Sequence, residues 1–172
     1  MRGEASPRPP RGSLLIRSFS PDDTRAAGDT LGRILLRRGG AGAVVALVGP
    51  LGSGKTCFVQ GLARGLGVSG YVRSPTFILL HEYRGPVPLY HLDFYRLTPS
   101  DADELGLEEI IEGTGVTAIE WAEHAEGVLP SEYLRVEFAF GEGESDRLLQ
   151  VSARGDRYRP IVEDVAECVF SR

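Results

Sequence analysis

Residues 49–56 read Gly-Pro-Leu-Gly-Ser-Gly-Lys-Thr, and this short segment restricts the fold more than any other part of the chain. It fits the pattern G-x-x-x-x-G-K-[ST], the Walker A loop, whose glycines let consecutive backbone N–H groups turn towards one phosphate. Such a loop needs a buried strand before it and a helix N-terminus after it. Residues 43–48 are all apolar, as in a strand buried on both faces. A helix is expected over residues 55–66, and Gly67 is placed to end it. The sequence therefore predicts an α/β fold with a phosphate-binding loop.

The side chains of this loop indicate which ligand it takes. Of the 19 basic residues only one is a lysine, and it is Lys55 of the motif. Its compact ammonium suits a tight cradle where it bridges the β- and γ-phosphates, while the Thr56 hydroxyl takes one Mg²⁺ position. A guanine-binding Asn-Lys-x-Asp motif needs a second lysine, so ATP is favoured over GTP. We expect the cofactors ATP and Mg²⁺ to be bound by loop residues Gly49, Leu51, Gly52, Ser53, Gly54, Lys55, Thr56 and Cys57.

Composition narrows the class of protein further. The chain has 172 residues, 42% of them hydrophobic, which is the size and content of one globular domain. Its net charge of −5 argues against a free-standing nucleic-acid binder, which normally has a basic face. Two cysteines make no disulfide framework, and no apolar run approaches the roughly 18 residues that span a bilayer. We expect a flexible tail over residues 1–12, a single domain over residues 13–172, no membrane contact and a cytoplasmic location.

Hydrophobic patterning predicts the remaining elements. Ser20 followed by Pro21 and two acids is a strong helix start, and apolar residues recur at helical spacing until Arg38. Alternating or continuous apolar runs predict strands over residues 14–19, 77–83, 88–93, 116–121, 133–140 and 147–153. Short helices are expected within residues 99–115 and a terminal helix over residues 160–170. The predicted fold class is a single-domain P-loop NTPase fold, with a mostly parallel central sheet, antiparallel hairpin additions and flanking helices.

Two acidic residues at predicted strand ends are candidates to complete the site. Glu120 ends an apolar strand and is assigned to the metal; Asp93 ends a strand nearer the sheet edge and is assigned to the γ-phosphate side, where it positions water or acts as a base. The alternative for each is a solvated charge at a strand end. Together with Lys55 and Asp93, Thr76 is a candidate catalytic residue. It belongs to the segment Ser-Pro-Thr, which is interpreted as a switch that senses the γ-phosphate. The alternative is that this segment is a plain turn.

Other polar residues give weaker signals. His81, His91 and His124 have no metal-ligand spacing and are interpreted as structural or surface groups. Arg96 and Arg147 are considered as charge stabilisers within the chain, but surface arginines are common. We therefore expect slow intrinsic hydrolysis that becomes useful only when a partner completes the site.

An ordered set of segments resembles one known family. Besides the Walker loop it comprises Ser74-Pro75-Thr76-Phe77, the run from Tyr90 to Leu97, Glu104-Leu105-Gly106-Leu107 and Ile119-Glu120-Trp121. Arg147 and residues 155–158 also sit where the family tends to have similar residues. This set resembles the bacterial tRNA threonylcarbamoyladenosine biosynthesis ATPases, the TsaE or YjeE type, over roughly residues 20–160. The Walker loop alone is shared by many proteins, but the ordered set is specific.

The resemblance implies a small ATPase that works with partner proteins to attach threonylcarbamoyl to adenosine 37 of ANN-decoding tRNAs, and that meets tRNA only through those partners. It implies that Thr56 and Glu120 ligate Mg²⁺, that Asp93 lies by the phosphates and that Ser-Pro-Thr is a switch. By the same resemblance Trp121 lies close to the nucleotide, and Thr24 falls where the family approaches the base. Judged alone, Trp121 would be read as packing.

The chain departs from the family at three loop positions. The family usually has Asp-Leu-Gly-Ala-Gly-Lys-Thr-Thr, and here Pro50, Ser53 and Cys57 replace its Asp, its Ala and its final Thr. Pro50 removes one N–H, and Cys57 replaces a hydroxyl donor to the α-phosphate with a weaker thiol. We expect these changes to lower the affinity for the nucleotide and to leave the type of site unchanged. Two other functions remain open: a small-molecule P-loop kinase, and a module that binds ATP to gate assembly without required hydrolysis.

Overall fold

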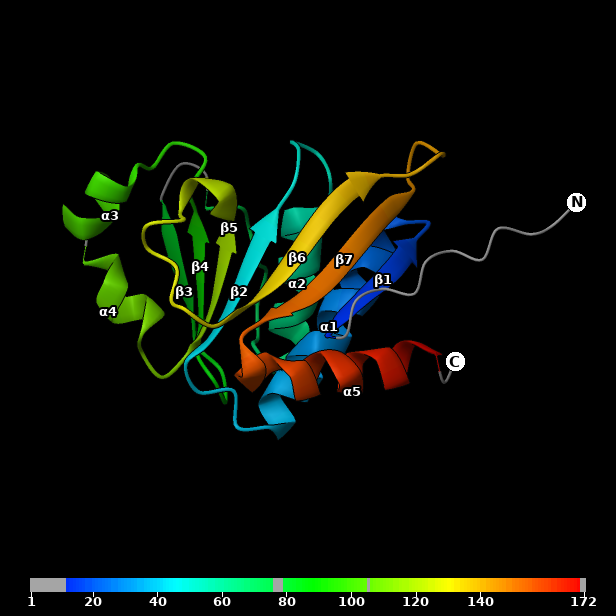
Figure 1. Cartoon of the computed structure of the whole chain (residues 1–172), viewed down its shortest axis with the longest axis horizontal. Helices are drawn as coiled ribbons and strands as arrows, with labels where there is room; N and C mark the ends of the chain where they lie inside the picture. The colour runs from blue at the N-terminus through cyan, green and yellow to red at the C-terminus, as the bar shows by residue number, and fades with distance from the viewer. Residues whose placement is uncertain (1–11, 76–78, 105, 171–172) are drawn as a thin grey trace, which may run out of the picture.

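The computed structural model describes residues 12–75, 79–104 and 106–170. The strands of this described part are β1 (Ser13–Ser18), β2 (Ala43–Val48), β3 (Leu80–Tyr83), β4 (Leu89–Asp93), β5 (Val116–Glu120), β6 (Tyr133–Phe140) and β7 (Arg147–Arg154). They form one sheet in the order β1-β7-β6-β2-β5-β4-β3 (Figure 1). The central strands β6, β2, β5 and β4 are parallel, and antiparallel strands extend the sheet at both edges. The predicted fold class is confirmed.

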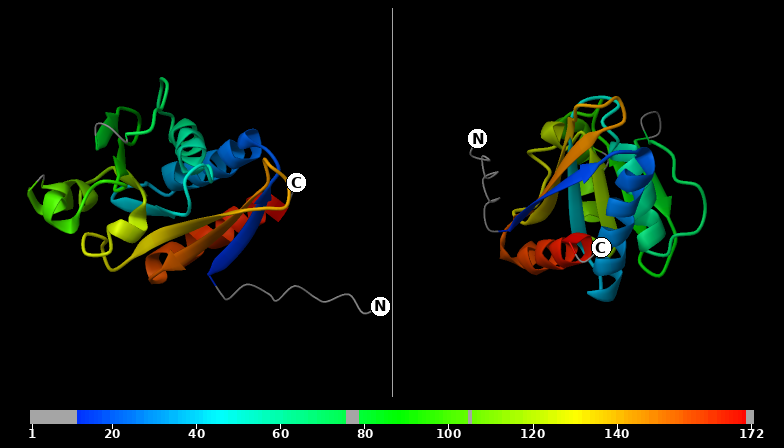
Figure 2. Two further views of the ribbon diagram at one scale, coloured as in Figure 1. Left: turned by 90° about the horizontal axis from the view of Figure 1, so that it is seen from above. Right: turned by 90° about the vertical axis from the view of Figure 1, so that its right-hand side faces the viewer.

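Helices cover both faces of this sheet. They are α1 (Pro21–Arg37), α2 (Lys55–Gly65), α3 (Pro99–Glu104), α4 (Leu107–Ile111) and α5 (Arg159–Phe170), with the 3₁₀ turns η1 (Ala122–His124) and η2 (Asp156–Tyr158). One buried cluster joins α1, α2 and α5 to one side of the sheet, and a second joins α3 and α4 to the other. The right-hand view of Figure 2 shows α5, in orange and red, beside α1, in blue. Every residue of β2 is buried, because the strand lies between both clusters. The central strand is therefore the rigid base of the loop that follows it.

The start of α1 follows the sequence prediction. The Ser20 hydroxyl accepts a hydrogen bond from the Asp23 N–H at 3.1 Å, and the Asp23 carboxylate accepts one from the Phe19 N–H at 3.0 Å. These reciprocal bonds satisfy N–H groups that a helix end leaves unpaired. The predicted cap is confirmed.

Helices α1 and α2 cross at very short range through four glycines. A methyl group added at Gly28 would overlap the Phe58 carbonyl oxygen, and one added at Gly61 would overlap the Arg25 carbonyl oxygen. Gly32 and Gly65 meet the partner helix in the same way. The two backbones therefore pack against each other without intervening side chains, which holds the N-terminus of α1 against the start of α2.

The predicted strands over residues 43–48 and 133–140 have the observed bounds. The other predicted strands differ from the observed ones by one residue at one or both ends, except that over residues 77–83, which differs more. The prediction for residues 116–121 is one residue too long, because Trp121 has a φ of 56° and turns the chain into η1. The described part of β3 starts at Leu80 rather than Phe77, and residues 76–78 lie outside the described residues. Of the predicted tail, residues 1–11 likewise lie outside them, and the carbonyl of Gly12 accepts a hydrogen bond from Ala153 on β7. The position of the site is unaffected by these differences.

Candidate nucleotide site

Three parallel strands end at one point of the sheet edge and bring the candidate residues together. In the strand register Glu120 of β5 lies opposite both Asp93 of β4 and Leu47 of β2, just before the glycine-rich loop. Ligands of open α/β sheets bind at this carboxyl edge. A cavity of about 280 Å³ opens there, lined by Leu51, Gly52, Ser53, Gly54, Lys55, Thr56, Cys57, Ser74, Asp93, Glu120 and Trp121.

Lys55 lies inside the loop with its charge held by backbone oxygens. Its Nζ donates to the carbonyl oxygens of Gly49 at 2.6 Å and Pro50 at 2.9 Å, and it lies 4.0 Å from the centre of the Trp121 ring. Burial lowers the pKa of this ammonium below the ordinary lysine value, while Glu120, Glu123 and Asp93 act in the opposite direction. The ammonium is therefore desolvated and placed to exchange loop carbonyls for phosphate oxygens.

Glu120 is fixed by two neighbours through one oxygen atom. Its Oε1 accepts a hydrogen bond from the Thr56 hydroxyl at 2.8 Å, and the His91 Nε2 lies 2.8 Å from the same Oε1. The hydroxyl proton of Thr56 points to Glu120, and the lone pairs of the Thr56 hydroxyl oxygen therefore face away from the carboxylate. Hydroxyl and carboxylate oxygens are the ligands that Mg²⁺ prefers, so these two residues fit the metal assigned to them.

Of the two interpretations that the sequence left for His91, a structural or a surface group, the structure supports the structural one. The side chain is completely buried and contacts Glu120, so it belongs to the site and is not a surface group. One available signal was the alternation of β4, which places His91 on the same face as Asp93 two residues later. Periodicity alone could not show that this face of β4 meets Glu120, because that depends on which strand pairs with β4.

Asp93 and the aromatic residues form the other wall of the cavity. Asp93 is 2% exposed, and its Oδ1 accepts a hydrogen bond from the Tyr95 N–H at 2.8 Å. The Trp121 ring lies 4.9 Å from the Tyr95 ring and 5.9 Å from the His124 ring, centre to centre. The left-handed backbone of Trp121 is rare for a bulky residue, and here it turns the indole towards Lys55.

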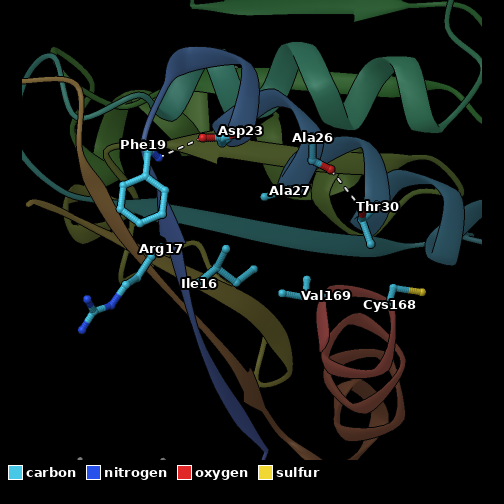
Figure 3. A pocket seen from close by; sticks show the side chains of 9 residues that line it. All are labelled: Ile16, Arg17, Phe19, Asp23, Ala26, Ala27, Thr30, Cys168 and Val169. Atoms are coloured by element: carbon cyan, nitrogen blue, oxygen red, sulfur yellow. Dashed lines mark hydrogen bonds between the residues drawn. The ribbon is translucent and has the colours of Figure 1, made fainter. Parts of the chain in front are cut away.

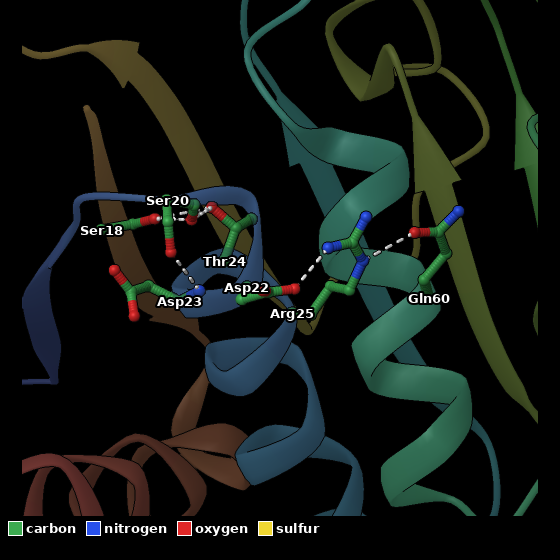
Figure 4. Close-up of polar contacts among 7 residues, drawn as sticks. All are labelled: Ser18, Ser20, Asp22, Asp23, Thr24, Arg25 and Gln60. Atoms are coloured by element: carbon green, nitrogen blue, oxygen red, sulfur yellow. Dashed lines mark hydrogen bonds and ion pairs between the residues drawn. The ribbon is translucent and has the colours of Figure 1, made fainter. Parts of the chain in front are cut away.

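Thr24 lies next to the loop but does not line the cavity. Its hydroxyl is 2.7 Å from the Ser18 hydroxyl (Figure 4). Its methyl group would lie 3.5 Å from a Cβ added at Gly54. In the same view Arg25 bridges Asp22 and Gln60 of α2. These contacts fix the start of α1 beside the loop, and a direct role for Thr24 in binding the base stays a prediction.

The remaining predicted residues are placed as follows. Ser74 lines the cavity, whereas Thr76 lies outside the described residues, so the switch stays a prediction. Gly49 contributes its carbonyl to Lys55, and its φ of 145° together with a close approach to Phe138 explains why glycine is required there. Within the described part of the chain, the Ser53 hydroxyl is completely buried and has no hydrogen-bond partner. A phosphate oxygen would satisfy this hydroxyl.

Arg147 reaches the loop from the start of β7. Its guanidinium donates to the Gly52 carbonyl at 3.1 Å, and it also donates to the carbonyls of Glu144 and Asp146 at 2.8 Å. The side chain therefore ties the β6–β7 turn to the glycine-rich loop and restricts the loop before any ligand binds.

Replacing Arg147 with alanine is expected to weaken ATP binding about fivefold, because one hydrogen bond that orders the loop is worth about 1 kcal/mol. Isothermal titration calorimetry measures the change. Arg154→Ala, at the other end of β7, is the matched control and should leave the affinity at the parental value. An unchanged affinity of Arg147→Ala would show that the loop is ordered without this contact.

Other features of the described residues lie apart from this site. A separate hollow of about 230 Å³ between β1, α1 and α5 shares no residue with the loop cavity (Figure 3). Within residues 12–75, 79–104 and 106–170, no three His, Cys, Asp or Glu side chains gather as a metal cage. A magnesium ion in a phosphate-binding loop takes most of its ligands from phosphate and water. No helix of the described chain combines the length and apolar character needed to cross a bilayer.

A central parallel sheet, a glycine-rich loop leading into a helix, and acids on the neighbouring strand ends define a P-loop NTPase-like fold. The family model described as "Threonylcarbamoyl adenosine biosynthesis protein TsaE" matches residues 19–148. The chain belongs to the TsaE family.

Individual relatives agree with this assignment. The TsaE protein of Bacillus subtilis is 37% identical over 154 residues, covering 89% of this chain and 94% of that protein. The TsaE protein of Treponema pallidum is 47% identical over 114 residues, and the match covers 66% of this chain and 82% of that protein. The crystal structure of Bacillus subtilis YdiB superposes with a TM-score of 0.76 at 34% identity, covering 91% of this chain and 95% of that one. The resemblance found in the sequence is confirmed.

Proposed function

We propose that this chain binds Mg²⁺-ATP and hydrolyses it as a cytoplasmic component of the machinery that makes threonylcarbamoyladenosine in tRNA, with hydrolysis dependent on partner proteins. The observation that carries the proposal is one cavity that joins a desolvated lysine, a hydroxyl–carboxylate pair and a second buried acid. Curated relatives that share most of the chain are named for threonylcarbamoyladenosine biosynthesis, which supports the pathway.

Each residue of the cavity has a separate role in this proposal. Lys55 binds the β- and γ-phosphates, and Thr56 with Glu120 holds Mg²⁺, which neutralises phosphate charge when bound. Asp93, whose carboxylate is fixed by the Tyr95 N–H, orients the attacking water and accepts its proton. Beside the cavity the side chains of Tyr95 and Leu51 are 47% and 76% exposed. Large exposed side chains of this kind are typical of protein–protein contacts, which supports the proposal that a partner protein binds over the site.

Hydrolysis and ATP-gated assembly are separated by Asp93→Ala and Glu120→Ala. We expect each variant to retain measurable ATP binding but to release inorganic phosphate more slowly when partners are present. Asp93→Ala should slow release at least about 100-fold, because a positioned base contributes about that factor or more. Glu120→Ala should slow it because the metal that neutralises phosphate charge would lose one of its ligands. A phosphate-release assay and a tRNA modification assay measure the two effects. Parental modification by both variants would favour the gating module.

A kinase would behave differently in the same assay. It would transfer the γ-phosphate to an added metabolite, whereas a hydrolase releases it as inorganic phosphate. The β6–β7 turn, which joins Phe140 to Arg147, is short and acidic and resembles no arginine-rich lid. This favours hydrolysis over phosphate transfer.

A further inference from the structure

His91 occupies a position that packing alone does not explain. The imidazole is completely buried in the layer between the sheet and α2, where its neighbours along the same face of β4 and β5 are the apolar Leu89, Val116 and Ala118. A polar ring is costly in such surroundings unless it is hydrogen-bonded. Its Nε2 lies 2.8 Å from Glu120 Oε1, whereas its Nδ1 is buried without a hydrogen-bond partner in the described part of the chain. The contact to the candidate metal-binding carboxylate is therefore the compensation that the ring gains for its burial.

Strand register explains how the ring reaches Glu120. His91 lies directly opposite Ala118, while Glu120 lies two residues further along the same face of β5. The alanine side chain leaves room, so the imidazole extends diagonally across it towards the carboxylate. A larger residue at position 118 would block this path.

The hydrogen-bond chemistry fixes the direction of the contact. A carboxylate oxygen only accepts, so His91 donates from Nε2 to Glu120. The Thr56 hydroxyl donates to the same Oε1 from α2, and Glu120 is therefore held from a neighbouring strand on one side and a helix on the other. Without His91 the carboxylate keeps one donor and gains freedom to rotate towards the Lys55 ammonium. Burial lowers the pKa of that ammonium, and the charge of Glu120 opposes the shift.

We propose that His91 is a positioning residue that sets the orientation of the Glu120 carboxylate, and through it the affinity of the site for Mg²⁺ with nucleotide. This inference rests on the proposed function, because it assigns Glu120 to the metal. Outer partners of metal ligands act in this way in other proteins, where their loss costs about 10- to 100-fold in metal affinity.

The test compares His91→Gln, His91→Asn and His91→Leu. A glutamine amide nitrogen comes close to the position of Nε2, whereas an asparagine amide ends near the position of Nδ1 and falls short of Glu120. Each variant is titrated with Mg²⁺ in the presence of ADP, and binding is followed by thermal stabilisation and by fluorescence of Trp121, the only tryptophan. His81→Gln, on the adjacent strand opposite His91, is the matched control.

We expect His91→Asn and His91→Leu to need about tenfold or more Mg²⁺ for half-maximal stabilisation. His91→Gln and the His81 control should stay within about twofold of the parent, and ADP binding without Mg²⁺ should be unchanged in all of them. A parental Mg²⁺ requirement in both His91→Asn and His91→Leu would overturn the role of His91. A parent protein that itself binds ADP without any response to Mg²⁺ would overturn the proposed metal site as well.

Discussion

Replacing Lys55 with alanine is expected to abolish measurable ATP binding, with a loss of affinity of about 1,000-fold, or about 4 kcal/mol. The ammonium makes charge-assisted hydrogen bonds to phosphate, which are among the strongest single contacts in such a site. Burial increases their value, because the surrounding medium screens charge less than water does. Isothermal titration calorimetry with ATP and Mg²⁺ provides the measurement.

Two variants control for other effects of the substitution. Lys55→Met keeps most of the apolar stem and should fold with a melting temperature at or above that of the parent, because it removes a desolvated charge. Lys55→Arg keeps the charge but brings a wide planar guanidinium, which does not fit a cradle whose backbone oxygens lie 2.6 and 2.9 Å from Nζ. ATP affinity within tenfold of the parent in Lys55→Met would contradict the assigned role.

Much of this site could be predicted because its signals are local. A buried six-residue strand, the glycine pattern and the cap at Ser20 each depend on residues close together in the chain, and each is confirmed. Glu120 and Asp93 could be expected at one edge because parallel strands end on the same side of a sheet. The family resemblance added the order of these motifs along the chain.

Two of the features missed by sequence reasoning depend on contacts between distant segments, and one is a local turn of the backbone. His91 meets Glu120 only because β4 pairs with β5 in one register and Ala118 is small, and no pattern within residues 88–93 contains that information. Trp121 continues an apolar run, so patterning extends the strand through it, whereas the observed backbone turns there. Arg147 reaches Gly52 across 95 positions of sequence.

The glycines of α1 and α2 are a further case in which tertiary packing opposes a local preference. Helix propensity alone says that Gly61→Ala stabilises α2 by about 1 kcal/mol. The structure predicts the opposite sign, because the new methyl group would overlap the carbonyl oxygen of Arg25. This contact is to backbone, which cannot move aside by changing a rotamer, so the helices must separate or the chain must unfold.

We expect Gly61→Ala to lower the stability of the protein by about 3 kcal/mol, which corresponds to a fall in melting temperature of about 6–12 °C for a chain of this size. Gly28→Ala should behave alike, since its methyl group would overlap the Phe58 carbonyl oxygen. Differential scanning calorimetry measures both. Gly39→Ala isolates the backbone cost, because an added Cβ there would meet no atom within 4 Å beyond its chain neighbours while φ is 86°. This variant should lose only about 1–2 kcal/mol of stability.

The same substitution connects packing to the nucleotide site. Arg25, which contacts Gly61 where the two helices cross, directly follows Thr24 in the sequence. The methyl group of Thr24 approaches Gly54 in the glycine-rich loop. If Gly61→Ala separates the helices without unfolding them, the N-terminus of α1 moves away from the loop and ATP binding weakens along with stability. A variant that melts at or above the parental temperature would show that the helices separate at no cost, and the close crossing would then be no determinant of this fold.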